Sequence, residues 1–347
     1  MEANQETGAA GGRPVLSICI TTFKRAHFIG ETLESLLRDA SDAMEVVVVD
    51  GASPDNTAEV IEAIARRNPC VRYFRESENL GIDGDFDKSI RYARGEYCWL
   101  FSDDDLLKPG AIPAILSRLD RPYSALVVNA EVRSVDLRRM LQASRLSISA
   151  DRVYLPGEMG ALFDDNVRHL SFIGALIVRR SLWLGRNSRQ YYGSYFVHIG
   201  VLFQEPLPGP VLAVAQPLIQ IRYGNASWTA RYFEIVMFKW PDLLWGLSTI
   251  DETARLRVVQ RTPWKSWKKL MLLRAMGAFT REIYQTVSQR NRFDAGDRRR
   301  LGILLLVPGW FANLAACTYT YLFGKDRDLG MVDLVNSPYY IGKRRVR

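Results

Sequence analysis

The sequence predicts an α/β protein whose mostly parallel sheet is followed by a helical C-terminal region. Two observations support this prediction. Between residues 14 and 130, short apolar runs alternate with segments in which apolar residues recur every three or four positions, as β-α-β units require. Beyond residue 235, Trp, Phe, Met and basic residues accumulate, and residues 301–324 contain no charged side chain.

Four strands are predicted in the first part of the chain, followed by a fifth apolar run. They cover residues 15–21, 45–50, 71–75 and 97–101, and the fifth run covers residues 125–129. Helices that pack on the sheet are predicted between them, because apolar pairs such as Ile61 and Ile64 are spaced by three or four residues. The less regular residues 131–235 are expected to complete the same domain.

The chain has 347 residues, more than one compact domain usually contains. We therefore expect a tail at residues 1–13, two halves of one main domain at 14–130 and 131–235, and a helical region at 236–347. Residues 1–13 carry no apolar run of the kind found in signal peptides, so the main domain is expected in the cytosol. The four cysteines include no C-x-x-C pair, and neither a disulfide nor a zinc site is predicted.

The basic residues are concentrated near the end of the chain. The formal net charge is +8, and residues 251–347 contain 19 Lys and Arg against 8 Asp and Glu, an excess of 11. Such a region can contact nucleic acid or anionic lipid. No nucleic-acid-binding module accompanies it, and the uncharged residues 301–324 have no role in binding nucleic acid, so a membrane surface is the predicted partner.

Residues 301–324 are long enough to cross a bilayer, which takes about 20 residues. Pro308 and Gly309 interrupt the run, and basic residues flank both of its ends. A single span would place these flanks on opposite sides of the membrane, against the usual distribution of positive charge. A re-entrant or in-plane pair of helices is therefore favoured, and the alternative is a helix buried against the main domain.

Polar and small residues follow each of the four predicted strands. Open α/β sheets bind ligands at the carboxyl ends of their strands, so these segments predict a ligand site at one edge. The segment after the fourth strand contains Asp103, Asp104 and Asp105. Adjacent carboxylates repel one another unless a cation is near, and oxygen ligands favour Mg²⁺ or Mn²⁺. The alternative is a solvated turn that caps the next helix.

Asp50 ends the second predicted strand and is followed by a polar segment that includes Ser53. Capping of the next helix fully explains Asp55 or Asn56. Asp50 itself lies at the sheet edge, where its carboxylate can accept hydrogen bonds from a nucleobase N–H or a ribose hydroxyl. Asp50 is therefore a candidate ligand-binding residue.

Four segments of the first half follow the order and spacing of motifs in a known family. Residues 16–25, 49–57, 79–81 and 95–105 read LSICITTFKR, VDGASPDNT, NLG and GEYCWLFSDDD. In these segments the chain resembles the family 2 glycosyltransferases of GT-A fold. Residues 171–180, 195–198 and 223–229 resemble, less closely, the abequosyltransferase-like branch that builds repeat units of bacterial O-antigen or capsule.

This resemblance implies roles for residues at the sheet edge. Thr21, Phe23 and Arg25 would line the nucleotide pocket, Asp50 and Ser53 would contact base and ribose, Asp85 would lie beside the nucleotide, and Asp103, Asp104 and Asp105 would hold a divalent metal and the sugar diphosphate. Ser102 stands where the family usually has its first aspartate. Asp104 is therefore expected to be the main metal ligand, with Asp103 also in contact with the donor.

The general base is expected in the second half of the domain, where inverting members of the family place a carboxylate that deprotonates the acceptor hydroxyl. No clear Glu-Asp pair occurs there. The candidates are Asp164, Asp165, His198 and Glu205. His198 could instead ligate the metal, and a hydrogen-bonded core histidine is an equal alternative.

The resemblance implies a metal-dependent enzyme that moves a sugar from a nucleotide-diphosphate sugar to a saccharide hydroxyl. Residues 14–130 would bind the donor and 131–235 the acceptor. The C-terminal region favours a lipid-linked saccharide acceptor at the cytoplasmic face of the bacterial inner membrane. A sugar nucleotidyltransferase is disfavoured because residues 22–25 contain no glycine-rich loop. A non-catalytic, membrane-bound carbohydrate-binding or scaffold protein is the other alternative.

Overall fold

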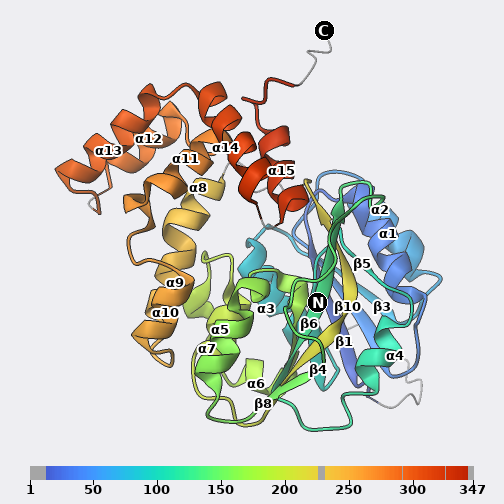
Figure 1. Ribbon diagram of the computed structural model, residues 1–347. Coiled ribbons are helices and arrows are strands. Elements are labelled where there is room, and N and C mark those ends of the chain that lie inside the picture. Colours follow the sequence, from blue (N-terminus) through green and yellow to red (C-terminus); the bar gives the residue numbers. More distant parts are fainter. Residues whose placement is uncertain (1–12, 226–230, 291, 325, 343–347) are drawn as a thin grey trace.

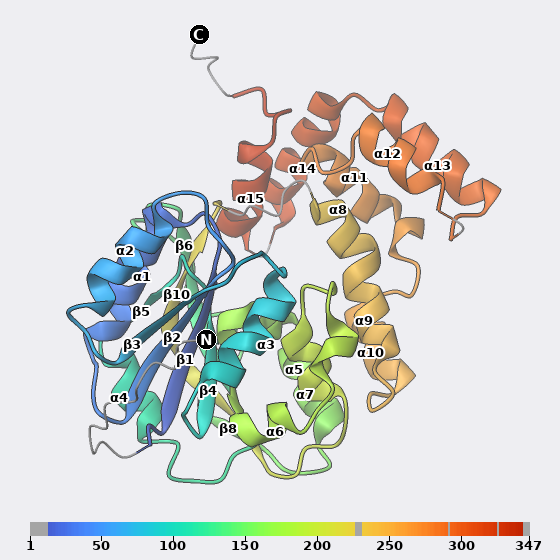
Figure 2. The ribbon, with the colours of Figure 1, turned by 180° about the vertical axis from the view of Figure 1, so that it is seen from behind.

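The computed structural model of the protein describes residues 13–225, 231–290, 292–324 and 326–342. One sheet forms the centre of the main body, with helices on both of its faces, and a group of C-terminal helices lies beside this body (Figures 1 and 2). The main body therefore has the layered arrangement of an α/β domain.

Ten strands pair in this sheet among the described residues. They are β1 (Leu16–Thr22), β2 (Met44–Asp50), β3 (Val71–Arg75), β4 (Tyr97–Phe101), β5 (Leu106–Leu107), β6 (Ala125–Ser134), β7 (Met140–Gln142), β8 (Arg152–Tyr154), β9 (Leu176–Arg179) and β10 (Val211–Tyr223). The main order is β3-β2-β1-β4-β9-β6-β10-β5, with β7 beside β6 and β8 beside β10.

The four strands predicted first form one parallel block, β3-β2-β1-β4. Their bounds differ from the predicted ones by at most one residue at each end, and the fifth predicted run extends into β6. β9 enters between β4 and β6 and is antiparallel to both, whereas β6 and β10 are parallel. The predicted fold class is confirmed as a mixed, mostly parallel GT-A-like sheet.

Helices cover the sheet on both faces. One face is covered by α1 (Ala26–Leu37), α2 (Thr57–Ala65) and α4 (Ala111–Leu116), and the other by α3 (Ile82–Tyr92), α5 (Met159–Leu170), α6 (Arg180–Leu184) and α7 (Val197–Phe203). In β1, Ile18 and Ile20 pack on the first face and Cys19 on the second. This alternation is the side-chain period of a strand buried on both faces.

The C-terminal part that the structure describes is helical. It contains α8 (Tyr232–Glu234), a π-helical turn (Ile235–Lys239), α9 (Trp240–Gly246), α10 (Glu252–Val258), α11 (Trp267–Ala275), α12 (Arg281–Ser288), α13 (Ala295–Leu306), α14 (Gly309–Phe323) and α15 (Arg327–Asn336). A separate apolar cluster, which includes Phe238, Trp264 and Phe293, holds these helices together. The helices therefore have a core of their own.

The α13 and α14 helices meet at an angle of 89°. Pro308 ends α13 because a proline disfavours helical geometry in the residue before it. Among the described residues, no single helix is long and apolar enough to cross a membrane, although this bent pair together passes that test by length and composition. The predicted break at Pro308 is present.

Candidate active site

The loops that follow β1, β2 and β4 meet at the carboxyl edge of the sheet. The backbone N–H of Gly51 donates to the carbonyl oxygen of Thr22 at 3.0 Å, which joins the ends of β2 and β1. The backbone N–H of Lys24 donates to the Ser53 hydroxyl at 3.0 Å. Residues far apart in the sequence are therefore packed side by side at the edge where α/β sheets bind ligands.

Asp103 and Asp104 face Arg25 at this edge. The Arg25 guanidinium lies 3.5 Å from an oxygen of Asp103 and 3.6 Å from an oxygen of Asp104. Burial and the neighbouring Asp104 carboxylate raise the pKa of Asp103 to about 7. One arginine therefore does not fully neutralise the two carboxylates, and the pair retains an affinity for another positive group.

Asp105 points into the protein. It is 3% exposed, and its carboxylate accepts hydrogen bonds from the Ser102 hydroxyl and, at 2.7 Å, from the backbone N–H of Arg222. Burial and the charge of Asp104 raise the pKa of Asp105. Both oxygens of Asp105 bond within the protein and fasten the acidic run to β10, which disfavours Asp105 as a metal ligand relative to Asp103 and Asp104.

The end of β10 holds Asp104 in place. Nδ2 of Asn225 donates to Oδ2 of Asp104 at 2.9 Å, and Nε of Arg222 donates to the backbone oxygen of Asp104 at 2.8 Å. Arg222 also forms an ion pair with Glu31 of α1 at 2.5 Å, and its guanidinium lies over the ring of Phe28. The acidic run is thus supported by a strand that lies more than a hundred residues further along the chain.

Arg222 and Asn225 were missed at the sequence level. No pattern singles out Arg222, which is separated from Asp104 by 118 positions. Asn225 lies within residues 223–229, which resemble the abequosyltransferase-like branch, so a signal for it was present. Residues 226–230 lie outside the part of the chain that the structure describes.

Asp50 and Ser53 form the next part of the edge. The fully buried carboxylate of Asp50 accepts hydrogen bonds from the backbone N–H of Ser53 at 2.9 Å and from the Tyr73 hydroxyl at 2.8 Å. Lys24 and Ala52, in the two adjoining loops, have φ angles of 59° and 61°. Left-handed backbone at non-glycine residues is strained, and such strain concentrates at ligand sites.

Asp85 of α3 lies against the loop after β2. A side chain on Gly51 would place its first carbon 3.0 Å from Oδ2 of Asp85. Oδ1 of Asp85 is buried and has no hydrogen-bond partner among the described residues. Burial raises the pKa of Asp85 to about 6. A buried oxygen without a partner can bind a ligand N–H or hydroxyl at this place.

Thr21 and Phe23 lie on either side of the end of β1. Thr21 is partly buried within the strand, and Phe23 is 40% exposed just beyond it. The exposed ring of Phe23 is adjacent in sequence to Lys24, whose ammonium lies 5.2 Å from the ring centre. Phe23 is therefore available to contact a planar ligand group.

The three carboxylate candidates for the general base lie apart from the acidic run. Asp164 forms an ion pair with Arg257 of α10. Asp165 pairs at 2.8 Å with Arg152 of β8, a strand that joins the start of β10, opposite to the end that carries Asn225 (Figure 1). Glu205 is exposed and follows α7. The structure does not bring these carboxylates to the acidic run.

His198 is a core histidine. It is 1% exposed, and its Nε2 donates to the carbonyl oxygen of Leu170 at 2.7 Å. Burial lowers its pKa to about 4, and His169 behaves in the same way against the carbonyl oxygen of Val128. The interpretation of His198 as a hydrogen-bonded packing residue is therefore the one that its surroundings favour, over base or metal ligand.

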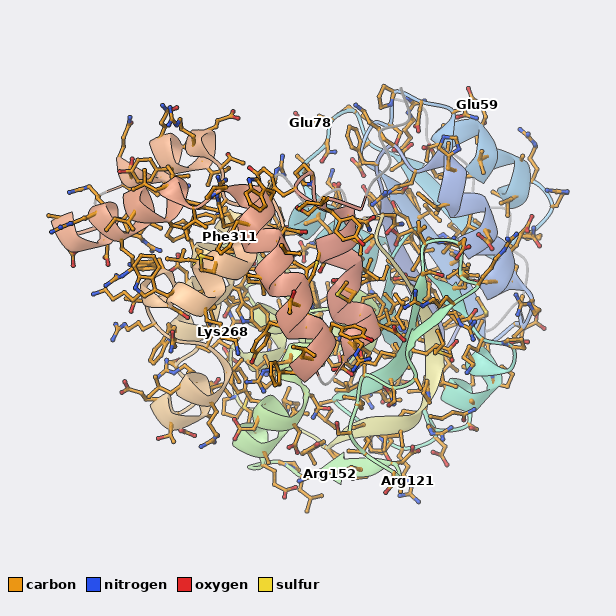
Figure 3. The ribbon with its side chains drawn as sticks, turned by 45° about the horizontal axis from the view of Figure 1, so that its top comes forward. Glu59, Glu78, Arg121, Arg152, Lys268 and Phe311 are labelled. Carbon is orange, nitrogen blue, oxygen red and sulfur yellow. The ribbon has the colours of Figure 1, made fainter. Side chains whose placement is uncertain are left out.

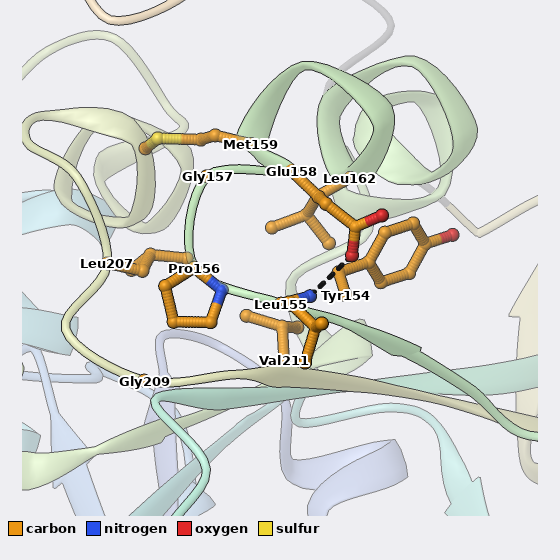
Figure 4. A pocket seen from close by; sticks show the side chains of 10 residues that line it. All are labelled: Tyr154, Leu155, Pro156, Gly157, Glu158, Met159, Leu162, Leu207, Gly209 and Val211. Atoms are coloured by element: carbon orange, nitrogen blue, oxygen red, sulfur yellow. Dashed lines mark hydrogen bonds between the residues drawn. The ribbon is translucent and has the colours of Figure 1, made fainter.

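A small cavity of about 20 Å³ lies near β8, at the end of the sheet opposite the acidic run (Figure 4). The carboxylate of Glu158 at its wall accepts a hydrogen bond from the backbone N–H of Leu155 at 2.6 Å. A space of this size holds about one water molecule. This cavity is far too small for a nucleotide sugar.

Comparison with known protein families identifies the family of the main domain. Residues 17–184 match the model of the family described as Glycosyl transferase family 2. These residues form a domain of this family. The match contains every residue of the carboxyl edge that precedes β10.

Two curated relatives of this family 2 glycosyltransferase carry named activities. The chain is 26% identical over 233 residues to abequosyltransferase RfbV of Salmonella typhimurium, which covers 61% of this chain and 68% of RfbV. It is 25% identical over 117 residues to a GalNAc(5)-diNAcBac-PP-undecaprenol beta-1,3-glucosyltransferase of Campylobacter jejuni, which covers 33% of this chain and 38% of that enzyme. The chain thus spans about two thirds of the first relative and less than two fifths of the second.

Among solved structures, the family 2 glycosyltransferase is similar to residues 1–349 of TarS from S. aureus. The TM-score is 0.52 at 14% sequence identity, and the likeness covers 92% of this chain and 90% of that one. TarS has also been crystallised with UDP-GlcNAc. At this level of identity the comparison supports the shared fold.

The described residues of this family 2 glycosyltransferase could bind a divalent cation whose coordination shell is completed by oxygens of the substrate. They contain no group of three or more metal-ligating side chains. Asp103 and Asp104 are adjacent, partly buried carboxylates that share one arginine, Arg25, at the edge. Mg²⁺ is commonly bound through one or two carboxylates together with substrate phosphates, so this pair is sufficient.

Proposed function

We propose that this family 2 glycosyltransferase transfers a sugar from a nucleotide-diphosphate donor to a hydroxyl of a lipid-linked saccharide during synthesis of a bacterial surface polysaccharide. The observation that carries the proposal is the pair Asp103 and Asp104, which faces Arg25 at the carboxyl edge of the sheet. RfbV is named for the transfer of a sugar, and the name of the Campylobacter glucosyltransferase describes a saccharide linked through a diphosphate to undecaprenol, which supports a lipid-linked acceptor.

The acidic run binds the diphosphate end of the donor. When bound, Mn²⁺ or Mg²⁺ supplies positive charge against the diphosphate as it leaves. Asp104 and Asp103 would hold this cation, and Asn225 keeps Asp104 in a fixed orientation. Arg25 can exchange part of its contact with the two carboxylates for the donor phosphates, because a guanidinium binds both kinds of oxygen.

The loops after β1 and β2 bind the nucleoside end of the donor. The unpartnered oxygen of Asp85 would accept a hydrogen bond from the base or ribose. Asp50 and Ser53 are buried and bonded within the protein, so contact with the donor would use the acceptor lone pairs that these bonds leave free. Thr21 and Phe23 contact the nucleotide from the end of β1. We accordingly propose that residues 14–130 supply most of the donor site and that residues 131–235 bind the acceptor, with Asn225 of the second range supporting Asp104.

The acceptor hydroxyl loses its proton as the new glycosidic bond forms. We do not assign the removal of this proton to Asp164, Asp165, Glu205 or His198. The carboxylates lie apart from the acidic run, and His198 is sealed in the core with a pKa that burial lowers to about 4.

The place of action that we propose is the cytoplasmic face of the bacterial inner membrane, with residues 236–347 as the membrane-associating part. The uncharged run at residues 301–324 and the basic excess of the C-terminal third support this location. A lipid-linked acceptor would be reached from that surface.

Donor binding is tested by thermal unfolding of the full chain with CDP, UDP, GDP or dTDP, each with and without Mn²⁺. We expect one of the four to raise the Tm, and to raise it further with Mn²⁺. Asp104→Asn should lose the Mn²⁺-dependent part, whereas Asp165→Asn, which changes a carboxylate at the opposite end of the sheet, should keep it. No shift with any nucleotide would refute the proposed donor site.

Turnover is tested with radiolabelled nucleotide sugars and extracted bacterial lipid-linked saccharides. Transfer of label to the lipid fraction, lost in Asp104→Asn, supports the proposal. Formation of a nucleotide sugar from a sugar phosphate and a nucleoside triphosphate would identify a nucleotidyltransferase instead. Tight saccharide binding without turnover would identify a carbohydrate-binding protein.

A further inference from the structure

We infer that the outward face of α13 and α14 is a docking surface for a bilayer interface containing anionic lipid, and that both helices lie in the plane of that interface. The docking face is defined by Leu306, Trp310, Phe311, Leu314, Leu322 and Phe323, which are between 49% and 80% exposed. The inference deepens the proposed function by naming the surface that would meet the membrane, and its evidence does not depend on the enzyme's chemistry.

The opposite face of the two helices is fastened to the protein. Leu301 and Leu304 of α13 are fully buried in the C-terminal apolar cluster. In α14, the buried side chain of Asn313 donates to the carbonyl oxygens of Ala275 and Leu334 at 3.1 and 2.9 Å. This anchor holds the inner side of α14 against α11 and α15, so that side faces protein.

The pair therefore has an inner face packed on protein and an outer face of large apolar side chains. The exposed positions of α14 include Phe311, Leu314 and Leu322, which are spaced so that they share one side of the helix. Exposed patches of this composition on a protein surface mark an interaction site. Trp and Phe on one face and basic groups beside it are typical of helices that lie in a membrane interface.

The basic groups around the docking face favour binding to an anionic bilayer. Lys268 lies 5.2 Å from the ring centre of Tyr319, and Arg327 lies 4.5 Å from that of Tyr321, which places basic groups along α14. Arg298 and Arg299 are exposed at the start of α13, and residues 301–324 contain no acidic group. Two copies of such a basic face would repel each other, whereas anionic headgroups are attracted to it.

The last helix links this surface to the active site. The Tyr223 hydroxyl at the end of β10 donates to Asp333 of α15 at 2.6 Å, and Arg139 pairs with Asp328 of α15 at 2.6 Å. The α14 and α15 helices lie on the side of the molecule toward which the end of β10 points (Figures 1 and 2). Docking through α14 would thus turn the carboxyl edge of the sheet toward the lipid.

Figure 3 shows that the docking face is separate from the region of β8. Phe311 and Lys268 lie in the left half of this view, and Arg121 and Arg152 lie at its lower edge. Leu155, which is 61% exposed, directly follows β8 and is close in sequence to Arg152. Leu155 therefore offers a matched apolar control for the docking face.

The test measures sedimentation of the full chain with vesicles of phosphatidylcholine alone or mixed with phosphatidylglycerol. We expect tighter binding to the mixed vesicles. Combined Trp310→Ser, Phe311→Ser and Phe323→Ser should weaken that binding by about tenfold or more, because each change removes apolar area that the bilayer would bury. Combined Leu155→Ser and Leu256→Ser, which change two exposed leucines elsewhere, should leave it unchanged.

A second pair of changes tests the charge. Arg298→Glu with Arg299→Glu should abolish the preference for phosphatidylglycerol. Circular dichroism and the Tm of each variant should match the unaltered protein, because every changed side chain is exposed. Equal binding of the triple serine variant and the unaltered protein would overturn the inference, as would a lack of binding to either vesicle.

Two further outcomes are separable from these. A dimer of the unaltered protein that the triple serine variant lacks, without vesicle binding, would show a second copy on this face and overturn the inference. If no nucleotide raises the Tm but vesicle binding behaves as expected, the proposed function fails and the docking surface stands. The triple variant should still bind the nucleotide, since none of its changes touches the carboxyl edge.

Discussion

At the scale of single residues, Asp85 lowers the stability of the folded protein around neutral pH. Burial raises its pKa to about 6 from an ordinary value of 3.8. The unfolded chain therefore releases this proton at a lower pH than the folded chain does. The free energy of unfolding falls as the pH rises through this interval, and the loss is complete above it.

Replacement of Asp85 by Asn removes that loss. We expect the free energy of unfolding of the ligand-free protein to rise by about 1–2 kcal/mol near neutral pH and to change little near the ordinary pKa of the group. Urea titrations at the two pH values measure the effect. Asp120→Asn, at an exposed aspartate, is the control, and an Asp85→Asn variant that is less stable at neutral pH would contradict this expectation.

His198 has the opposite effect on the pH dependence. Burial lowers its pKa from 6.5 to about 4, so between these pH values His198 is protonated in the unfolded chain and neutral in the folded chain. Stability is therefore lost as the pH falls between these values. His198→Gln, which retains a donor for the Leu170 carbonyl, should reduce this loss by about 1–3 kcal/mol. The exposed His27 gives the control His27→Gln, and an unchanged slope in acid would count against the assignment.

At the scale of elements, β10 is both a sheet strand and the support of the acidic run. Asn225→Ala removes the side-chain contact with Asp104 and leaves the strand intact. We expect turnover to fall by about tenfold or more, with a weaker response to Mn²⁺ and a Tm within a few degrees of the unaltered protein. Asn187→Ala, at an exposed asparagine, is the control. Full activity of Asn225→Ala would show that Asp104 needs no such support.

The strands differ in how well the sequence predicts them. The parallel block of β1 to β4 was predictable because each strand is a short apolar run between helix-like segments. β5, β7 and β8 have two or three residues each, too few for a period to appear. β9 reads as an apolar run, but its antiparallel place between β4 and β6 depends on tertiary packing.

The candidate site likewise contains residues that the sequence predicts and residues that depend on distant partners. Asp50 and the acidic run stand directly after predicted strands, so the rule for α/β sheets located them. The inward turn of Asp105 depends on Arg222, and the orientation of Asp104 depends on Asn225, both far along the chain. Local pattern does not report such distant partners. The role of His198 could not be decided from the sequence, because apolar neighbours in sequence do not distinguish a buried packing histidine from a reactive one.

At the scale of the whole molecule, the charge is divided between two regions. Residues 251–347 carry an excess of 11 positive charges and the whole chain only 8, so the preceding residues carry a net charge of −3. Raising the salt from low to about 0.5 M should weaken binding to anionic vesicles strongly, because screening shortens electrostatic attraction to a few ångströms. Nucleotide-induced Tm shifts, measured in parallel, should change much less. Vesicle binding that does not change with salt concentration would show that apolar contacts alone bind the protein to the bilayer.

The contact between α15 and β10 has a consequence for how the protein is made. Tyr223 and Gly224 directly precede Asn225, and they rest against residues 327–336, almost at the end of the chain. A nascent chain still within the ribosome lacks that helix when its sheet is already synthesised. We therefore expect a chain shortened to about residue 324 to keep Arg222 and Asn225 beside the acidic run but to lose the packing of α15 on Tyr223 and Gly224.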